Sequence, residues 1–378
     1  MYNPIEMVPM PFEIPKDIML CHEEAKGKAF IRKIWGKQAT FVCTIGNTET
    51  GKIPGISAAG AVPEITDFTP AADVELLYYG WCKCINGVPV TPNGIPTPGL
   101  ITVSATKLGK MPIFAVVGGV NVRPNAPFFD LDGKSGKDIR SGRSVEDPFK
   151  VFERAVVVGE QLAATSRLLV VGESIAGGTT TALGVLTALG YDAFGKVSST
   201  LPENPHDLKT QVVKEGIANS GRSIEELRKD PMAAIAAVGD PMMPAAAGVV
   251  VGAASKVPVI MAGGTQMAAV LAVVKGMEAK ALKNVAIGTT RWITSDKCSA
   301  IADLVKQIGK VPIIAANLDF TQSRYDGLRI YETGLVKEGV GAGGSTIAAI
   351  TGSRGAIDAK AMLVDIDATY ERLMVKMA

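Results

Sequence analysis

The feature that most constrains this sequence is a series of short apolar runs that alternate with helical patterns. The runs are bounded by glycine or proline and are almost continuously apolar, which is typical of strands covered on both faces in a parallel sheet. The predicted strands are 41–45, 113–117, 168–171, 257–261, 285–287 and 311–315. The predicted helices are 146–164, 180–189, 208–218, 245–254, 267–274 and 297–308. This alternation predicts an α/β fold with a doubly wound, mostly parallel, Rossmann-like sheet.

The length of 378 residues is enough for one large α/β domain. We expect this domain to span 30–350. The terminal segments 1–29 and 351–378, the second of which has a helical pattern, are expected to pack as a small accessory helical subdomain. Two long segments rich in turn-forming residues, 87–98 and 125–143, are predicted loops of the kind that often carry function.

Composition excludes several classes of partner. The formal net charge is +2, and no basic run suggests a nucleic-acid or membrane-surface partner. The most apolar stretch, 241–274, is interrupted by Lys256 and Pro258, so we expect buried core and no membrane span. The five cysteines are an odd number in a long chain, which favours a reducing, cytoplasmic location. With two histidines and an isolated Cys82-Lys83-Cys84, we expect neither a metal site nor a cofactor.

The strongest local motif is the turn 172–181, which follows a predicted buried strand and opens a predicted helix. Glycines let backbone N–H groups converge, and the helix N-terminus adds partial positive charge, so the turn suits an anion such as phosphate. Its binding candidates are Gly177, Gly178, Thr179 and Thr180. Glu173 adds a carboxylate at the strand end, where α/β folds bind ligands. The alternative is an ordinary strand-to-helix turn with threonine as the helix cap.

Two later segments repeat the pattern of glycines beside hydroxyl or carboxylate side chains. In 257–267, a strand precedes two glycines and a threonine. In 337–346, a glutamate precedes a run of glycines. The binding candidates there are Gly263, Gly264, Thr265, Glu338, Gly339 and Gly341. Because a doubly wound sheet gathers such turns at one edge, we expect them to share a crevice.

Two segments imitate better-known nucleotide motifs. The segment 46–52 has the spacing of a P-loop, but Ile53 replaces the hydroxyl residue that holds magnesium, and Pro54-Gly55 would break the following helix. The segment 339–344 is similar to a dinucleotide fingerprint, yet it lies too near the C-terminus to leave a full βαβ unit. Neither an NTPase nor a nicotinamide dehydrogenase is therefore favoured.

Taken together, these segments resemble the nicotinate-nucleotide:dimethylbenzimidazole phosphoribosyltransferase family, in particular its divergent archaeal relatives. The segments that carry the resemblance are 55–58, 63–66, 172–181, 204–213, 238–264 and 338–342. The segment 172–181 is similar to the family's Gly-Glu-x-Gly-x-x-Asn-Thr-Thr turn. The segment 338–342 is similar to its Glu-Gly-x-Gly-Ala motif. Order and spacing over about 41–350, more than any single motif, make the resemblance specific.

The resemblance implies transfer of phosphoribose from nicotinate mononucleotide to a benzimidazole-like base, as in assembly of the lower ligand of cobalamin. It also implies a homodimer or a higher homo-oligomer. The implied phosphate cradle consists of Gly177, Gly178, Thr179, Ser199 and Lys209, with Gly263, Gly264 and Thr265 lining the same crevice. A carboxylate is needed to take the proton of the acceptor base. Asp296 is the first choice for this role and Glu173 the alternative, with a contribution from Glu49 left open.

Departures from the family pattern leave other functions open. The family's N-terminal Pro-Pro-Gly-Ser-Leu-Gly segment, which helps to form the base pocket, is absent, and Ala262 replaces its Asp-Gly-Phe aspartate. A non-catalytic or different-substrate nucleotide-binding protein on the same fold therefore stays an alternative. A transferase that uses phosphoribosyl pyrophosphate is less favoured, because Glu173 and Glu203 are single acids where that class usually has two. Asp296 has a second reading as the cap of the next helix.

Overall fold

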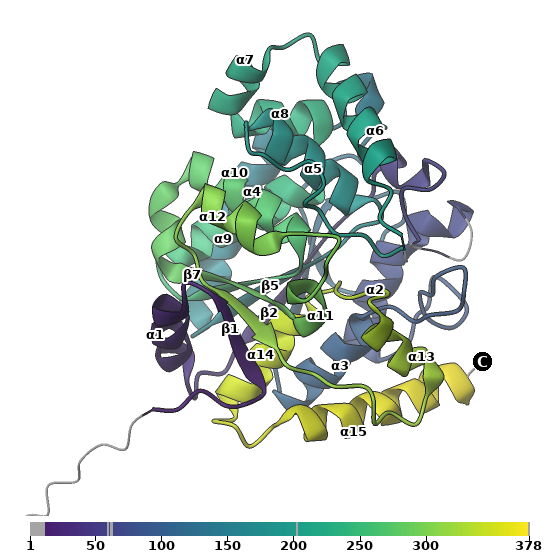
Figure 1. Ribbon diagram of the computed structural model, residues 1–378, viewed down its shortest axis with the longest axis vertical. Helices are drawn as coiled ribbons and strands as arrows, with labels where there is room; N and C mark the ends of the chain where they lie inside the picture. Colours follow the sequence, from purple (N-terminus) through teal and green to yellow (C-terminus); the bar gives the residue numbers. More distant parts are fainter. Residues whose placement is uncertain (1–11, 59, 61–62, 202, 377–378) are drawn as a thin grey trace, which may run out of the picture.

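A central eight-stranded sheet with helices on both faces organises the chain (Figure 1). The computed structural model describes residues 12–58, 60, 63–201 and 203–376. The strands are β1 (Ile18–His22), β2 (Thr40–Gly46), β3 (Ile113–Gly119), β4 (Phe128–Asp130), β5 (Leu169–Ser174), β6 (Val259–Ala262), β7 (Val285–Thr290) and β8 (Ile313–Ala316). Their order is β1-β8-β7-β6-β5-β2-β3-β4, and only β1 pairs antiparallel. The predicted α/β fold with a mostly parallel sheet is confirmed.

Alternate residues of the central strands feed two separate hydrophobic cores. Val42 and Val171 belong to one core, whereas Phe41 and Val170 belong to the other. The first core is covered by α4 (Pro148–Thr165), α5 (Gly178–Ala188), α6 (His206–Asn219), α7 (Ile224–Lys229), α8 (Pro231–Val238), α9 (Met242–Ala254), α10 (Thr265–Met277) and α12 (Ile301–Ile308). The second is covered by α1 (Glu24–Ile34), α2 (Thr69–Tyr79), α3 (Gly99–Leu108), α13 (Asp326–Arg329), α14 (Ala342–Gly352) and α15 (Ala359–Tyr370). Burial on both faces explains why the strands are continuously apolar.

Short helical turns complete the secondary structure. They are the α-helix α11 (Arg291–Thr294), the 3₁₀ turns η1 (Glu49–Lys52), η2 (Pro63–Phe68), η3 (Ile139–Ser141), η4 (Ala279–Asn284) and η5 (Ile330–Thr333), and the π-helical turn η6 (Glu371–Val375). The apolar stretch 241–274 is divided among α9, β6 and α10. None of the helices in the described part of the chain is long and apolar enough to cross a membrane.

The order of the strands creates a switch point in the middle of the sheet. After β2 the chain adds β3 and β4 on one side, and then returns to place β5 on the other side of β2. At such a point the connections leave in opposite directions and open a crevice at the carboxyl ends of the two strands. The turn that follows β5 begins at this crevice.

The terminal segments differ from the expected helical subdomain. Residues 18–22 form β1, which extends the main sheet beside β8, and α15 packs on α3 of the main body. The strand was missed because it is short and mostly only half-buried, so it lacks both an apolar run and a clear alternation. Residues 1–11 and 377–378 of the predicted subdomain lie outside the described residues.

Other helices and strands also differ from the predicted ones in position or number. The short strand β4 falls within the predicted loop 125–143, and α2 and α3 flank the loop 87–98 without having been predicted. The helix predicted to begin at 297 begins at Ile301, because Asp296 accepts hydrogen bonds within the preceding turn, from the Cys298 N–H and the Ser299 hydroxyl.

The contact between α4 and α9 depends on glycines, which leads to a stability prediction. A Cβ atom on Gly252 of α9 would lie 2.1 Å from the Val156 carbonyl oxygen of α4. We expect Gly252→Ala to lower the free energy of unfolding by about 1–3 kcal/mol, since overpacking separates the helices. Gly27→Ala in α1 is the control, because its new Cβ would meet only the flexible Leu20 side chain at close range. Urea unfolding of both variants tests this, and equal stability of the two would contradict it.

Candidate active site

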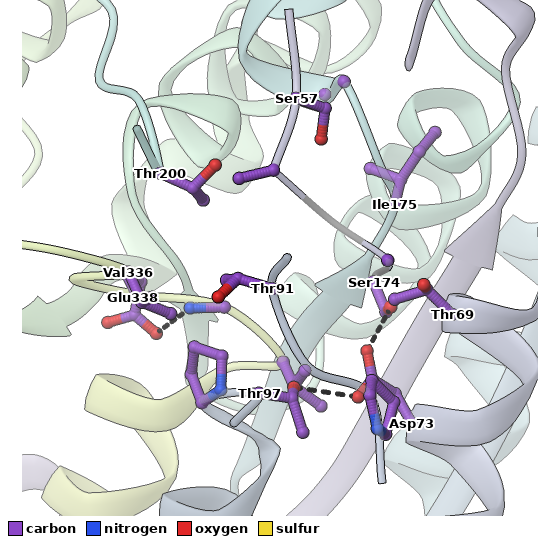
Figure 2. Close-up of a pocket in the computed structure, with 18 of the residues that line it drawn as sticks. Ser57, Thr69, Asp73, Thr91, Thr97, Ser174, Ile175, Thr200, Val336 and Glu338 are labelled. Carbon is purple, nitrogen blue, oxygen red and sulfur yellow. Dashed lines mark hydrogen bonds between the residues drawn. The ribbon is translucent and has the colours of Figure 1, made fainter. Parts of the chain in front are cut away.

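A pocket lies at the switch point, where β5 ends beside β2 (Figure 2). It encloses about 790 Å³, part of it open to solvent. Its walls come from the 56–58 segment, helix α2, the 89–98 segment, the 173–179 turn and the 336–340 segment. The fold therefore brings the predicted loop 87–98 and all three glycine-containing segments to one cavity, the segment 257–267 through Gln266.

The pocket is lined by carboxyl groups without a basic partner. Asp73, Glu173 and Glu338 line it, and the described lining residues include no lysine, arginine or histidine. Burial of an acid away from water disfavours its charged form. It raises the pKa of Glu173 to about 8, that of Glu338 to about 7 and that of Asp73 to about 6. Three acids thus titrate near neutral pH in one cavity.

Backbone N–H groups hold the Glu338 side chain. Its Oε1 accepts from the N–H groups of Gly339 and Gly343, both at 3.2 Å, and Gly343 also approaches Oε2. Gly343 is in the first turn of α14, so the carboxylate lies at a helix N-terminus, where negative charge is favoured. Burial raises the pKa of Glu338, and these N–H groups oppose the rise. Glu338 is therefore held as a hydrogen-bond acceptor.

The segment that carries Glu338 is fixed directly to the end of β5. The Val340 N–H donates to the Glu173 carbonyl oxygen at 3.1 Å, and the Thr102 hydroxyl donates to the Val340 carbonyl oxygen at 2.9 Å. Gly341 adopts a φ of 73°, a left-handed conformation suited to glycine, and packs against Gly172. Gly341 itself does not line the pocket, but it allows the chain to turn Glu338 toward Glu173.

The carboxyl group of Glu173, unlike that of Glu338, is not held by backbone N–H groups in the described part of the chain. No described residue donates a hydrogen bond to its carboxyl group. Burial, together with the negative charges of Asp240, Glu338 and Asp73, raises its pKa to about 8. Backbone N–H groups favour the charged form of Glu338 and have no counterpart among the described residues at Glu173, so Glu338 ionises first of the two and Glu173 keeps its proton to a higher pH. A neutral carboxyl group can donate a hydrogen bond, which a carboxylate cannot do.

The turn into α5 supplies free N–H groups. Gly177 has a φ of 79°, and a Cβ atom there would lie 2.6 Å from the Gly51 Cα atom, so the position requires glycine. Gly177, Gly178 and Thr179 line the pocket at the start of the helix. The first N–H groups of a helix have no partner within it. Thr180 lies behind them, with a buried hydroxyl that has no partner among the described residues.

The remaining cradle candidates form a layer behind the pocket. Ser199, Lys209, Gly263, Gly264 and Thr265 are not among the described lining residues. The Lys209 Nζ donates to the Ser198 carbonyl oxygen at 2.8 Å, and the Ser198 N–H donates to the Thr265 hydroxyl at 3.0 Å. Burial, followed by the nearby charge of Lys337, lowers the pKa of Lys209 to about 7. These contacts fix the segment that brings Thr200 to the pocket wall.

Asp296 and Glu49 lie outside the described pocket lining. Asp296 pairs with the Lys337 Nζ at 3.3 Å and accepts a hydrogen bond from the Cys298 N–H in its own turn. The alternative, that it caps the next helix, is wrong, because α12 begins after Ala300 without a side-chain cap. Glu49 forms an ion pair with Lys52 at 2.8 Å. No cluster of His, Cys, Asp and Glu within the described ranges is arranged to hold a metal ion.

Sequence reasoning missed several side chains of the site. The pocket residues it did not name include Ser57, Thr69, Asp73, Thr200 and Gln266. Asp73 left one signal, because it is an acid within the otherwise mostly apolar helix α2, which packs all of residues 69–77 inside. A charged residue in such a run is rarely buried without a reason.

Comparison with known proteins places the chain in a family. A phosphoribosyltransferase family model matches residues 149–322. A UPF0284 protein of Sulfolobus acidocaldarius is 45% identical over 351 residues, covering 91% of this chain and 99% of the relative. A UPF0284 protein of Methanothermobacter thermautotrophicus is 43% identical, covering 85% of this chain and 90% of the relative.

Solved structures share the fold at low sequence identity. The nicotinate-nucleotide-dimethylbenzimidazole phosphoribosyltransferase of Thermus thermophilus matches with a TM-score of 0.53 and 17% identity, over 84% of this chain and 83% of that one. A structure of CobT from the same organism matches with a TM-score of 0.54 and 16% identity, over 86% and 89%. The chain therefore belongs to the family of the UPF0284 proteins, and its residues 149–322 match a phosphoribosyltransferase family model.

Proposed function

We propose that this protein transfers phosphoribose from nicotinate mononucleotide to the ring nitrogen of an aromatic base. The observation that carries the proposal is the meeting, in one pocket, of Glu173, Glu338 and the N-terminus of α5. The match of residues 149–322 to a phosphoribosyltransferase model supports it. We propose in addition that the enzyme is cytoplasmic and works as a homo-oligomer.

The reaction needs little acid assistance at the leaving group. A lone pair of the acceptor nitrogen attacks C1′ of the ribose, and the bond from C1′ to the pyridinium nitrogen breaks. Its electron pair neutralises the positive charge of that nitrogen, and nicotinate leaves. The acceptor ring, now positively charged, loses the proton of its N–H group to a carboxylate. The products are nicotinate and an α-ribazole-type phosphate.

We assign the base to Glu338 in place of Asp296. Glu338 faces the pocket, whereas Asp296 pairs with Lys337 outside the described lining. The N–H groups of Gly339 and Gly343 keep the Glu338 carboxylate in one position. A base with a pKa near the working pH has both the charged form and the affinity to take a proton. The negative charge of Glu338 also stabilises the oxocarbenium-like ribose in the transition state.

Glu173 receives a different role from the one first considered for it. Since its pKa is about 8, it is mostly neutral when Glu338 is ionised. The proton lets it donate a hydrogen bond to an oxygen of the nucleotide, and it avoids repulsion between two carboxylates. Environments that separate the pKa values of two acids in one site commonly indicate separate roles.

The phosphate is assigned to the start of α5. Gly178 and Thr179 present N–H groups at the positive end of an 11-residue helix, on the pocket wall. Thr200 lies on the same wall, held by the Lys209 layer. We retain Ser199 and Lys209 as supports of the cradle, since a phosphate would reach them only after a local shift of the segment.

The deciding experiment measures nicotinate release. The protein is incubated with nicotinate mononucleotide and, one at a time, with benzimidazoles, phenols and purines, and the products are separated by chromatography. The proposal expects nicotinate and a ribosylated base in equal amounts. Binding of nicotinate mononucleotide without release in any mixture would favour the alternative, a non-catalytic nucleotide-binding protein on the same fold.

A further inference from the structure

The side of the pocket that lies away from Glu338 holds a second polar group, Asp73 of helix α2. Figure 2 shows the two carboxyl groups on opposite sides of the cavity. The Thr97 hydroxyl donates to Asp73 Oδ1 at 2.9 Å, and the Ser174 hydroxyl donates to Oδ2 at 2.7 Å. Asp73 thus joins the loop 87–98 to the end of β5. Its place in the pocket is not needed for the transfer step described above.

The two hydroxyl groups do not exhaust what Asp73 can accept. An ionised carboxylate offers about four acceptor positions, and two are filled here. The side chain is 2% exposed, so bulk water does not provide the rest. A buried carboxylate with free acceptor positions beside a cavity suits a ligand that donates hydrogen bonds.

Thr69 supplies an independent observation one helical turn earlier. Residues four apart on a helix share a face, and both Thr69 and Asp73 line the pocket. The Thr69 hydroxyl is buried and has no hydrogen-bond partner among the described residues. Leaving a buried polar group unpaired is unfavourable, so such groups are normally satisfied by protein, water or ligand. Two adjacent polar groups of α2 therefore have unused hydrogen-bonding capacity on the same side of the pocket.

The loop 87–98 lines the pocket from Asp73, which its Thr97 contacts, to Gly339, where a Cβ atom would lie 3.3 Å from the Pro98 ring. This wall is mostly apolar and suits a flat ring. It contributes Pro89, Val90, Ile95, Pro96 and Pro98, beside Thr91 and Thr97. The loop is held in place by the hydrogen bond from Thr97 to Asp73 and by one from the Tyr331 hydroxyl to the Pro96 carbonyl oxygen, at 3.0 Å. A ring lying against these side chains would turn one edge toward Glu338 and the opposite edge toward Thr69 and Asp73.

We propose that Thr69 and Asp73 are specificity residues that select an acceptor base with a hydrogen-bond donor, such as an amino group, on the edge remote from the reacting nitrogen. Asp73 accepts one N–H of that group, and the Thr69 hydroxyl accepts the other. The inference rests on the proposed function for the identity of the ligand as an acceptor base. Its recognition step is open to measurement by binding alone.

The test compares 5-aminobenzimidazole with 5-methylbenzimidazole, which differ in the donor and hardly in shape. Isothermal titration calorimetry of the wild-type protein is expected to show binding of the amino compound about tenfold tighter or more, since one well-made hydrogen bond is worth about that factor. Asp73→Asn and Thr69→Val are each expected to reduce this preference severalfold. Thr69→Ser, which keeps the hydroxyl group, is expected to retain it. Thermal unfolding of each variant checks that the fold is intact.

Each outcome distinguishes this inference from the proposed function. Equal binding of the two bases, no binding of either, or an unchanged preference in both Asp73→Asn and Thr69→Val overturns the inference, and leaves Asp73 as a structural tie for the loop. Absence of nicotinate release with these two bases and with every other base of the panel overturns the proposed function, while a binding preference lost in Asp73→Asn would still support recognition of the donor. Nicotinate release with both bases, together with equal binding of the two, supports the proposed function and rejects the proposed role of Thr69 and Asp73 in specificity.

Discussion

Replacement of Glu338 by glutamine is expected to lower kcat for phosphoribosyl transfer by about 10²–10⁴-fold, the contribution typical of a positioned general base. The amide oxygen of glutamine still accepts from Gly339 and Gly343, so the turn before α14 stays in place. What is lost is the ability to take the proton of the acceptor and the negative charge beside the ribose. Steady-state assays of nicotinate release, with KM measured separately, test this expectation.

Two comparisons make the Glu338→Gln result interpretable. Asp296→Asn is expected to retain most of its turnover, because Asp296 lies outside the described pocket lining and pairs with Lys337. The fold of Glu338→Gln should be at least as stable as the wild type near neutral pH. The pKa of Glu338 in the folded state, about 7, is above the ordinary value, so the ionised form opposes folding there. Full turnover in Glu338→Gln, with a large loss in Asp296→Asn, would restore Asp296 as the base.

The sheet was predictable because its strands are buried on both faces. The runs later found in β2, β3, β5, β6, β7 and β8 are continuously apolar, and this property is local in sequence. The strands β1 and β4 have half-buried or exposed residues, so only their pairing with β8 and β3 defines them. The strand order, and with it the switch point, is a property of long-range pairing that no local pattern carries.

The site was predictable where glycine or helix geometry dictates the residue type. Gly177 needs a positive φ, and Glu338 precedes a glycine-rich helix start, so both left a visible motif. Asp73 and Thr69 left almost none, because the polar residues of a mostly apolar helix, Glu75 among them, gain meaning only from what faces them. The choice of Asp296 as base relied on its position after a strand. The structure shows that its side chain turns to Lys337.

The dependence of the reaction on pH should identify the two glutamates. Glu338 acts only when ionised, so kcat is expected to rise as pH increases through about 7. Glu173 donates a hydrogen bond only when protonated, so kcat is expected to fall as pH increases through about 8. The result is a bell-shaped profile with a narrow maximum between the two values. At about two pH units below the acidic limb, kcat should be about 100-fold lower, because each pH unit removes a factor of ten of the ionised base.

Glu173→Gln separates the two limbs of this profile. The amide still donates a hydrogen bond but cannot ionise, so the alkaline limb should disappear and the acidic limb should remain. Glu173→Ala is the matched control, since it removes both the donor and the titration and should lower kcat at every pH. Rates of nicotinate release from about pH 5 to about pH 10 measure both limbs. If the alkaline limb persists in Glu173→Gln, the limb belongs to another group. Lys209 is the first to examine, because its pKa is lowered to about 7 and its ammonium group supports the segment that carries Thr200.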